Sequence, residues 1–201
     1  MTEPRVHIVD DDDAMRDSLK WLLESRGLEV ELYPSGEAFL AAFNSGFGGC
    51  LVLDVRMPDM NGLELYEELQ ARASTLPVIF ITGHGDVPMA VSALKKGAAD
   101  FIEKPFNDQD MLRLIETCMK QDRAAAAKRA ENASLAQRLD SLTPREREVL
   151  DLIVAGKLNK QIADELGISI KTVEVHRSRV MEKMAANSVA ELVQRVLKSR
   201  V

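Results

Sequence analysis

Cys50-Leu51-Val52-Leu53-Asp54 is an apolar run that ends in a carboxylate. The residues that follow, Val55-Arg56-Met57-Pro58-Asp59-Met60-Asn61-Gly62, include the proline and the glycine of a loop. A short apolar run bounded by turn residues is typical of a buried strand in a parallel sheet. Open α/β sheets bind their ligands at the carboxyl ends of such strands. Asp54 is therefore predicted to lie at a functional edge of a sheet.

Four more apolar runs lie on either side of this one within the first 120 residues. Together the five runs are Val6–Val9, Val30–Leu32, Leu51–Asp54, Val78–Ile81 and Phe101–Ile102. Segments with helical periodicity alternate with them at about Ala14–Ser25, Gly36–Phe43, Leu63–Arg72, Val87–Lys96 and Asp108–Lys120. Five alternating strand and helix units predict a doubly wound α/β fold, with a five-stranded parallel sheet and helices on both faces.

Charge is distributed unevenly along the 201 residues, whose formal net charge is −6. Residues 1–120 contain 21 acidic and 11 basic side chains, whereas residues 143–201 contain 8 acidic and 11 basic ones. This asymmetry predicts two modules with different partners. No apolar stretch approaches the ~20 residues of a membrane span. No signal peptide is visible either, so we expect a cytoplasmic protein with no membrane partner, in which Cys50 and Cys118 are buried, reduced thiols.

Residues 121–142 are rich in alanine and charge and contain neither glycine nor proline. Their high helix propensity predicts a helical linker, which either continues the preceding helix or begins anew. A flexible coil is the alternative. We therefore expect three parts: a first domain at 1–120, a linker at 121–138 and a second domain at 139–201.

The second domain has the sequence signals of four helices. Thr143-Pro144-Arg145-Glu146 is a capping box with proline at the first helical position. Asn159 and Ser169 are expected to cap the second and third helices, and Ser188–Glu191 forms another capping box before the fourth. The expected helices are 144–155, 160–166, 170–184 and 189 to about 198.

Side chains with reactive or ligand groups end four of the predicted strands. Asp10 and Asp11 follow the first run, Asp54 ends the third, Thr82 follows the fourth and Lys104 follows the fifth. Parallel strands end at one edge of a sheet, so these side chains are expected to converge. Three carboxylates repel one another unless a cation lies between them, and Mg²⁺ prefers oxygen ligands. The pattern predicts a magnesium and phosphoryl-transfer site.

Within this site, Asp11 and Asp54 are expected to supply the metal carboxylates, while Asp10 positions a metal-bound water. Asp54 would act as the nucleophile that forms an acyl phosphate, with the Lys104 ammonium and the Thr82 hydroxyl around it. The alternative is a solvated acidic turn beside a helix-capping aspartate. An EF-hand is excluded, since the acidic run lacks its spacing. His84 is expected to be a loop residue at the mouth of the pocket.

Residues 5–120 resemble the receiver domain of two-component response regulators, which has a flavodoxin-like (CheY-like) fold. The matching segments are Ile8-Val9-Asp10-Asp11, Asp54 with Met57-Pro58 and Gly62, Ile81-Thr82-Gly83, and Lys104-Pro105-Phe106. The resemblance implies that a sensor histidine kinase phosphorylates Asp54, with Mg²⁺ as cofactor and the Arg56 backbone carbonyl in the metal shell. It also implies that Thr82 and Phe101, the latter in place of the commoner tyrosine, move on phosphorylation, and that the Lys104–Pro105 bond is cis.

The second and third helices of the second domain have helix-turn-helix spacing. In the third helix, Ile170, Val173, Val180 and Met184 recur at helical spacing and are predicted to face the core. The opposite face is polar and partly basic, as a helix that enters the major groove requires. A generic helical bundle with a solvated face is the alternative, because a net charge of +3 is a weak sign of DNA binding.

Residues 139–200 resemble the LuxR-type DNA-binding domain, and the whole chain resembles the FixJ group of response regulators. The matching segments are Leu142–Leu150, Asn159–Ala163, Lys171–His176 and, for the FixJ group, Gly83–Pro88 and Thr172–Arg177. The resemblance implies that the last helix pairs two copies on a two-fold operator in double-stranded DNA, with Leu192 and Val196 exposed. The residues expected to face base edges are Glu174, Val175 and Ser178, and those expected to contact phosphates are Lys160, Lys171, Thr172, His176, Arg177 and Arg179.

The expected function is that of a transcription factor switched by phosphorylation of Asp54. It would form a homodimer when phosphorylated, contact RNA polymerase, and catalyse only its own phosphorylation and dephosphorylation. A phosphatase of the aspartyl-phosphate class is disfavoured, since it needs a second acid where Arg56 stands. The remaining alternative is a constitutive DNA-binding protein whose first domain is only a dimerisation scaffold.

Overall fold

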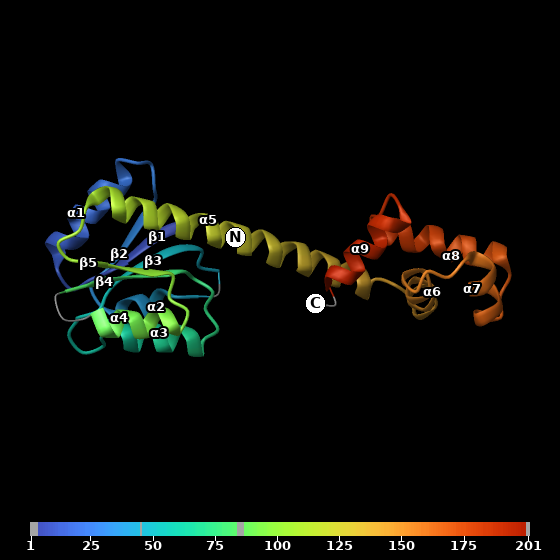
Figure 1. Ribbon diagram of the computed structural model, residues 1–201, viewed down its shortest axis with the longest axis horizontal. Coiled ribbons are helices and arrows are strands. Elements are labelled where there is room, and N and C mark those ends of the chain that lie inside the picture. The colour runs from blue at the N-terminus through green and yellow to red at the C-terminus, as the bar shows by residue number, and fades with distance from the viewer. Residues whose placement is uncertain (1–3, 45, 84–86, 200–201) are drawn as a thin grey trace. The chain divides into compact units, whose positions relative to one another are not determined.

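The computed structural model in Figure 1 describes residues 4–44, 46–83 and 87–199. The chain divides into two units, residues 1–126 and residues 127–201. Among the described residues, the first unit has two hydrophobic clusters and the second has one. No helix in the described part of the chain is long and apolar enough to span a membrane.

A five-stranded sheet forms the centre of the first unit. Its strands are β1 (Arg5–Val9), β2 (Val30–Tyr33), β3 (Gly49–Asp54), β4 (Val78–Thr82) and β5 (Asp100–Glu103). They are parallel and lie in the order β2-β1-β3-β4-β5. Each strand begins and ends within about two residues of its predicted apolar run, and β3 is buried along its whole length. The predicted doubly wound α/β fold is confirmed.

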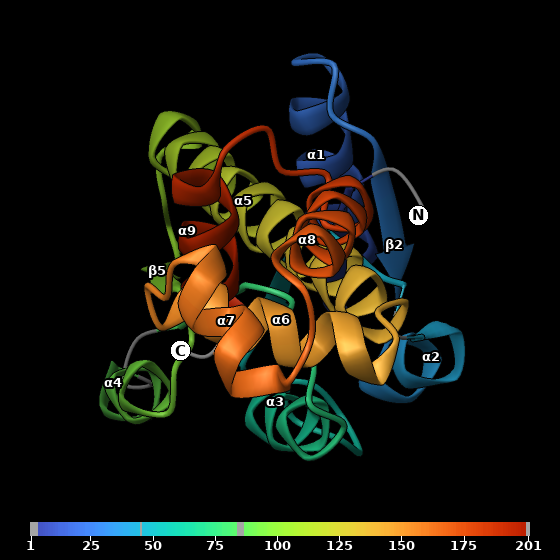
Figure 2. The same cartoon turned by 90° about the vertical axis from the view of Figure 1, so that its right-hand side faces the viewer.

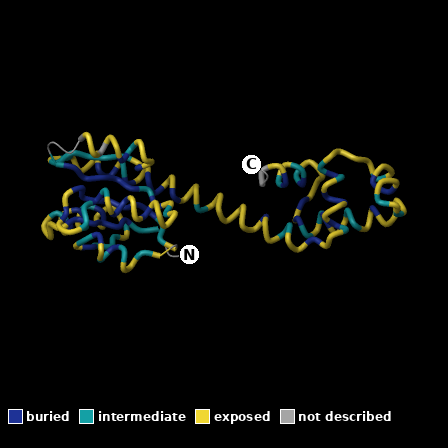
Figure 3. Tube along the Cα trace, turned by 90° about the horizontal axis from the view of Figure 1, so that it is seen from below, coloured by how far each residue is buried: buried dark blue, intermediate teal, exposed yellow. Residues whose placement is uncertain are grey.

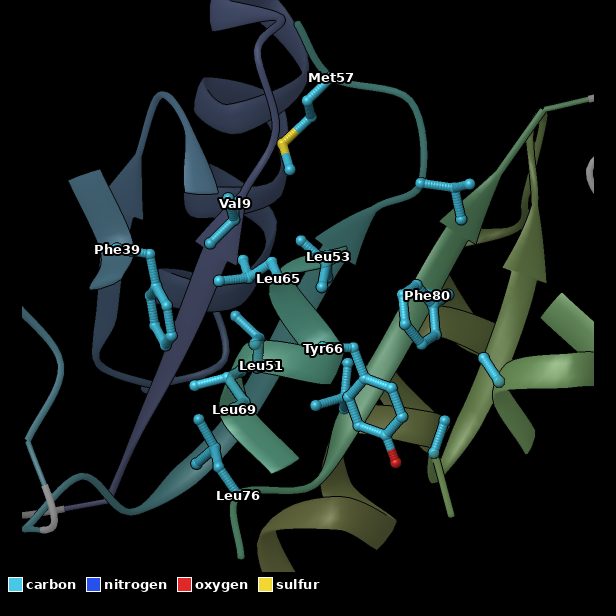
Figure 4. Close-up of a cluster of buried hydrophobic side chains, with 14 of the residues drawn as sticks. Val9, Phe39, Leu51, Leu53, Met57, Leu65, Tyr66, Leu69, Leu76 and Phe80 are labelled. Carbon is cyan, nitrogen blue, oxygen red and sulfur yellow. The ribbon is translucent and has the colours of Figure 1, made fainter. Parts of the chain in front are cut away.

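Helices cover both faces of this sheet (Figure 1). On one face lie α1 (Asp13–Glu24) and α5 (Asp108–Asp140), and on the other lie α2 (Gly36–Ala42), α3 (Gly62–Ala71) and α4 (Val87–Lys95). Figure 4 shows the cluster on the second face, where Phe39, Leu65 and Leu69 of the helices meet Leu53 and Phe80 of the strands. Successive side chains of a strand point to opposite faces of the sheet, so the strands contribute residues to both clusters, as a sheet covered on two faces requires.

The predicted linker is part of a single helix, because α5 continues without a break from Asp108 to Asp140. Its first turns bury Met111 and Ile115 against the sheet, and its last turns bury Leu135 in the core of the second unit. Most of the residues between are exposed (Figure 3). The structure therefore has a helix where a flexible coil was the alternative.

The described part of the second unit contains four further helices (Figure 2). They are α6 (Pro144–Val154), α7 (Asn159–Leu166), α8 (Ile170–Lys183) and α9 (Val189–Ser199). The Thr143 capping box is present, with Thr143 Oγ1 and the Glu146 carboxylate each accepting a backbone N–H of the other residue. Ser169 caps α8 as predicted.

Two expectations about the helices of the second unit are wrong, and a third is half confirmed. Asn159 is the first residue of α7 and not its cap, because the Leu158 backbone precedes the helix and donates to the Gln161 side chain at 2.8 Å. Ile170 is 47% exposed, since it lies in the first turn of α8, before the buried stripe that begins at Val173. Ser188 Oγ accepts the Glu191 N–H at 3.1 Å as predicted, but the Glu191 carboxylate accepts the Asn187 N–H and not that of Ser188, so only half of the second capping box forms.

The prediction that Leu192 and Val196 are exposed for pairing is also wrong. Leu192 is fully buried and Val196 is 2% exposed, because α9 packs its apolar stripe into the core of the second unit. The large apolar side chains that α9 exposes are Val189 and Leu197. Val173, Val180 and Met184 of α8 are buried in that core as predicted.

Candidate functional site

Polar side chains lie buried at the carboxyl edge of the sheet, where their strands end. Asp54 is the last residue of β3, Thr82 is the last of β4, and Asp10 directly follows β1. All three are less than 9% exposed. Burying polar groups of this kind is unfavourable unless they have partners, so the contacts of these side chains indicate which ligands the site can bind.

Lys104, which follows β5, joins two of these carboxylates. Its Nζ lies 2.8 Å from Asp54 Oδ1 and 3.2 Å from Asp10 Oδ2. Burial raises the pKa of the Asp54 carboxyl above its usual value, although the Lys104 hydrogen bond and charge oppose this. Burial lowers the pKa of Lys104, but Asp54 and Asp10 outweigh it, and the net pKa is raised. The lysine is therefore held in its charged form beside the Asp54 oxygen.

Three carboxylates meet beside the lysine. Asp10, Asp11 and Asp54 can each place one oxygen within 4.8 Å of the others. One lysine does not balance three acids, so the cluster keeps an excess of negative charge that a divalent cation would neutralise. Three oxygen donors with Asp11 open to solvent suit Mg²⁺, which keeps several waters. They are too few to form an all-protein calcium cage.

The remaining carboxylate oxygens are oriented by the backbone of the adjoining loops. Asp54 Oδ2 accepts the Arg56 N–H at 3.0 Å, and Asp10 Oδ1 accepts the Asp12 N–H at 2.9 Å. These hydrogen bonds fix both side chains without using the oxygens that face Lys104. Asp10 and Asp54 are therefore held in place by the protein alone.

Gly62 lets α3 approach the end of β3. A Cβ atom at this position would lie 2.2 Å from the Asp54 carbonyl oxygen, and the Gly62 N–H donates to the Val55 carbonyl at 3.0 Å. Only glycine permits such a close approach of backbone to backbone. The Met57-Pro58…Gly62 segment of the sequence thus serves to place the first turn of α3 against Asp54.

The two predicted switch residues lie on neighbouring strands. The Thr82 hydroxyl is buried and donates to the Ile102 carbonyl of β5 at 3.4 Å. Phe101 lies on β5 opposite Phe80 and is half-buried against the cluster of Figure 4. The Lys104–Pro105 peptide bond is cis, as expected. His84 lies outside the described residues.

The predicted DNA-contacting residues lie mainly on one helix, α8. Glu174 and Val175 are exposed, and the exposed fraction of Val175 is 46%. Val173, which directly precedes them, is buried. Thr172 is exposed, but its hydroxyl lies 2.8 Å from the Ser169 hydroxyl. The other exposed members of the set are Lys160 on α7 and Lys171, Ser178 and Arg179 on α8, and the half-buried members are His176 and Arg177.

A partly buried ion pair joins the last residue of α8 to the first turn of α6. Lys183 Nζ lies 2.6 Å from the Glu146 carboxylate and donates to the Ser141 carbonyl at 3.0 Å. The Lys183 hydrogen bond and the Thr143 N–H lower the pKa of Glu146 to about 2. The carboxylate therefore stays charged and holds the helix in position.

Two residues that contact this machinery were not predicted from the sequence. Arg16 of α1 donates to the Asp10 carbonyl at 2.5 Å, and Asp122 of α5 accepts the Gly49 N–H at 2.8 Å. A cation in the first turn of a helix is unfavourable because that end carries partial positive charge. An arginine at position 16, near the start of α1, was therefore a sign in the sequence that its side chain has a specific partner. For Asp122, the sequence pattern gave no such sign.

The class of protein follows from the matches of the two units. Residues 6–116 match the response regulator receiver domain, and residues 140–196 match the luxR family of bacterial regulatory proteins. The chain belongs to the two-component response regulators that join these two domains. Their family function is phosphorylation-dependent control of transcription, with a sensor kinase and DNA as partners, and not metabolic catalysis.

Particular relatives match over nearly the whole chain. The transcriptional regulatory protein FixJ of Bradyrhizobium diazoefficiens is 46% identical over 198 residues, which cover 98% of this chain and 97% of FixJ. The C4-dicarboxylate transport regulator DctR of Rhodobacter capsulatus is 47% identical over 191 residues, covering 94% and 97%. Among solved structures, response regulator StyR matches with a TM-score of 0.92 at 45% identity, covering 98% of this chain and 100% of StyR.

Proposed function

We propose that Asp54 is the phosphoacceptor and that its phosphorylation by a sensor histidine kinase controls DNA binding. The observation that supports this most directly is that the Asp54 carboxylate lies 2.8 Å from Lys104 and within 4.8 Å of the other two acids. An Asp54 oxygen attacks the phosphorus of a phosphohistidine, the P–O bond forms, and the P–N bond breaks as the imidazole leaves. The Lys104 ammonium binds a phosphoryl oxygen and offsets the growing charge.

Mg²⁺ is the proposed cofactor. Asp10, Asp11, Asp54 and the Arg56 backbone carbonyl would hold it. When bound, the ion neutralises the acids and the incoming phosphoryl group. The crowding of three carboxylates within 4.8 Å supports this assignment, since such a cluster is unfavourable without a cation.

Thr82 and Phe101 are the proposed switch. The Thr82 hydroxyl now donates to a β5 carbonyl at the long distance of 3.4 Å, a weak hydrogen bond. A phosphoryl oxygen on Asp54 is a charged acceptor and would form a stronger one. Reorientation of Thr82 would free space into which Phe101 turns, which would change the surface of α4 and β5. The phosphate thereby shifts an existing equilibrium between two states.

The second domain is proposed to read double-stranded DNA through α8. Glu174, Val175 and Ser178 would face base edges, while phosphate contacts come from Lys160, Lys171, Thr172, His176, Arg177 and Arg179. Seven of these nine side chains are exposed on α7 and α8, which supports the proposal, and the other two, His176 and Arg177, are half-buried. We further propose a phosphorylated homodimer on a two-fold operator, contact with RNA polymerase, and action in the cytoplasm. The working division is a receiver at 1–120, a linker at 121–138 and a DNA-binding domain at 139–201.

Labelling with acetyl phosphate and Mg²⁺ tests the phosphoacceptor. The wild type should gain one phosphoryl group by intact mass, and Asp54→Ala should gain none. Asp17→Ala, which removes an exposed aspartate of α1, is the control and should label as the wild type does. Full labelling of Asp54→Ala would show that another residue accepts the phosphate.

A further inference from the structure

Arg16 is a buried cation in a place where a cation is unfavourable. It lies in the first turn of α1 and is 9% exposed. The amino end of a helix carries partial positive charge, and burying a guanidinium is unfavourable unless it is paired. The contacts of Arg16 must therefore offset both effects.

The Arg16 guanidinium reaches back over the turn between β1 and α1. Nη1 donates to the backbone carbonyl of Asp10 at 2.5 Å, and Nη2 forms an ion pair with the Asp13 carboxylate. Asp13 is largely exposed, so the buried partner is the Asp10 carbonyl. One side chain thus connects the last residue before the turn with the first residue of the helix.

This turn carries two of the three clustered acids, Asp10 and Asp11. The Asp10 carboxylate has its own partners, the Asp12 N–H and Lys104. Asp11 is exposed, and within the described part of the chain its carboxylate forms no hydrogen bond or ion pair. Its direction therefore depends on the backbone of the turn, which Arg16 holds at Asp10.

We propose that Arg16 is a positioning residue for the divalent cation. By holding the Asp10 carbonyl, it fixes the turn that presents the Asp10 and Asp11 carboxylates to the ion. The inference rests on the proposed metal site and adds to it a residue that touches neither metal nor phosphate. Removing partners that orient metal ligands typically weakens metal binding by about 10–100-fold.

Binding of Mn²⁺, measured as free ion by electron paramagnetic resonance on the full-length protein, tests this. Arg16→Met keeps much of the stem and loses the donors, so its Kd for Mn²⁺ should rise by about 10-fold or more. Arg16→Lys should fall between Arg16→Met and the wild type, because one ammonium replaces two donors. Arg26→Met, which removes an exposed arginine just after α1, should bind as the wild type does.

Phosphorylation supplies a second measurement. The Mg²⁺ concentration for half-maximal labelling by acetyl phosphate should rise in Arg16→Met, while the rate at saturating Mg²⁺ stays near that of the wild type. An unchanged Kd for Mn²⁺ in Arg16→Met would overturn the proposal. So would a slower saturated rate with an unchanged Mg²⁺ requirement, which would give Arg16 a part in the chemistry.

Two outcomes remain to be separated. If Arg16→Met does not fold, as judged by circular dichroism, Arg16→Lys carries the test, and a wild-type Kd in that variant overturns the proposal. If the wild type itself binds no Mn²⁺, the proposed metal site is wrong, and with it the role of Arg16. If the wild type binds Mn²⁺ and is labelled by acetyl phosphate, and Arg16→Met has the same Kd for Mn²⁺, only the role of Arg16 is refuted.

Discussion

The carboxylate of Asp122 accepts a hydrogen bond from the backbone N–H of Gly49 at 2.8 Å. Asp122 lies on α5 and is 4% exposed, and Gly49 is the first residue of β3. The same strand ends in Asp54. The long helix that continues into the second unit is therefore fixed to the strand that carries the proposed phosphoacceptor, at the opposite end of that strand.

Asp122→Ala should destabilise the first unit by about 1–3 kcal/mol, because it leaves a buried N–H without its partner. Asp122→Asn should cost less, since its amide oxygen can still accept. Hydrogen exchange of the Gly49 amide in the full-length protein measures the effect directly. Asp110→Ala, which removes an exposed acid of the same helix, is the control. Equal exchange rates in Asp122→Ala and the wild type would contradict the contact.

Gly62→Ala should displace the end of β3. Its Cβ atom would lie 2.2 Å from the Asp54 carbonyl oxygen, so either α3 or the strand must move. Overpacking of this kind typically costs about 1–3 kcal/mol. We expect a lower melting temperature together with slower labelling of Asp54 by acetyl phosphate. Labelling at the wild-type rate would show that the phosphoacceptor tolerates the movement of α3.

The second unit should lose stability in acid through Glu146. Its pKa is lowered from 4.5 in the unfolded chain to about 2 in the folded one, chiefly by Lys183. The folded state therefore binds fewer protons, and this contribution is complete above pH 4.5 and is lost as the pH falls towards 2. Glu146→Gln should unfold more easily at neutral pH, by about 1–3 kcal/mol, and lack this part of the acid dependence. Denaturant titrations at several pH values measure it.

The first unit should also lose stability as the pH falls, but in a higher pH range than the second unit, because of His7. Burial lowers the pKa of His7 from 6.5, although Glu31 at 3.5 Å opposes this and Arg5 adds to it. The unfolded chain takes up the proton first, so the stabilisation is complete above pH 6.5 and is lost as the pH falls below it.

His7→Phe should remove this dependence while keeping a ring stacked on Phe47, whose centroid lies 4.7 Å from that of His7. Hydrogen exchange of the β1 amides between pH 7.5 and 5.5 (on the order of one unit either side of the histidine pKa) distinguishes the two proteins. His176→Gln, in the second unit, is the control and should leave the β1 amides unchanged. Identical pH dependence in His7→Phe and the wild type would assign the effect to other groups.

The sheet and the convergence at its edge were predictable because they depend on local pattern. Apolar runs that end in Asp54, Thr82 or Lys104 specify both the strand and the residue at its end. Parallel order then brings the ends together. The Thr143 box was predictable for the same reason, since a cap and its partner lie three residues apart.

What could not be predicted depends on tertiary packing. The periodicity of α9 shows an apolar stripe but not whether another chain or its own core covers it, and the core covers Leu192 and Val196. Ile170 shares the period of Val173 yet lies beyond the region that the neighbouring helices cover. Arg16 and Asp122 each contact a backbone atom, so the sequence pattern does not identify the partner of either side chain.

The central claim is that phosphorylation of Asp54 controls DNA binding, and one measurement tests it most directly. Affinity for an operator, selected from random DNA with the phosphorylated protein, is measured by fluorescence anisotropy with and without beryllofluoride and Mg²⁺. The wild type should bind about 5–150-fold more tightly when beryllofluoride is present. Asp54→Ala should show no change. Equal and tight binding by both proteins in both conditions would contradict the claim and support a constitutive DNA-binding protein with its receiver as a scaffold.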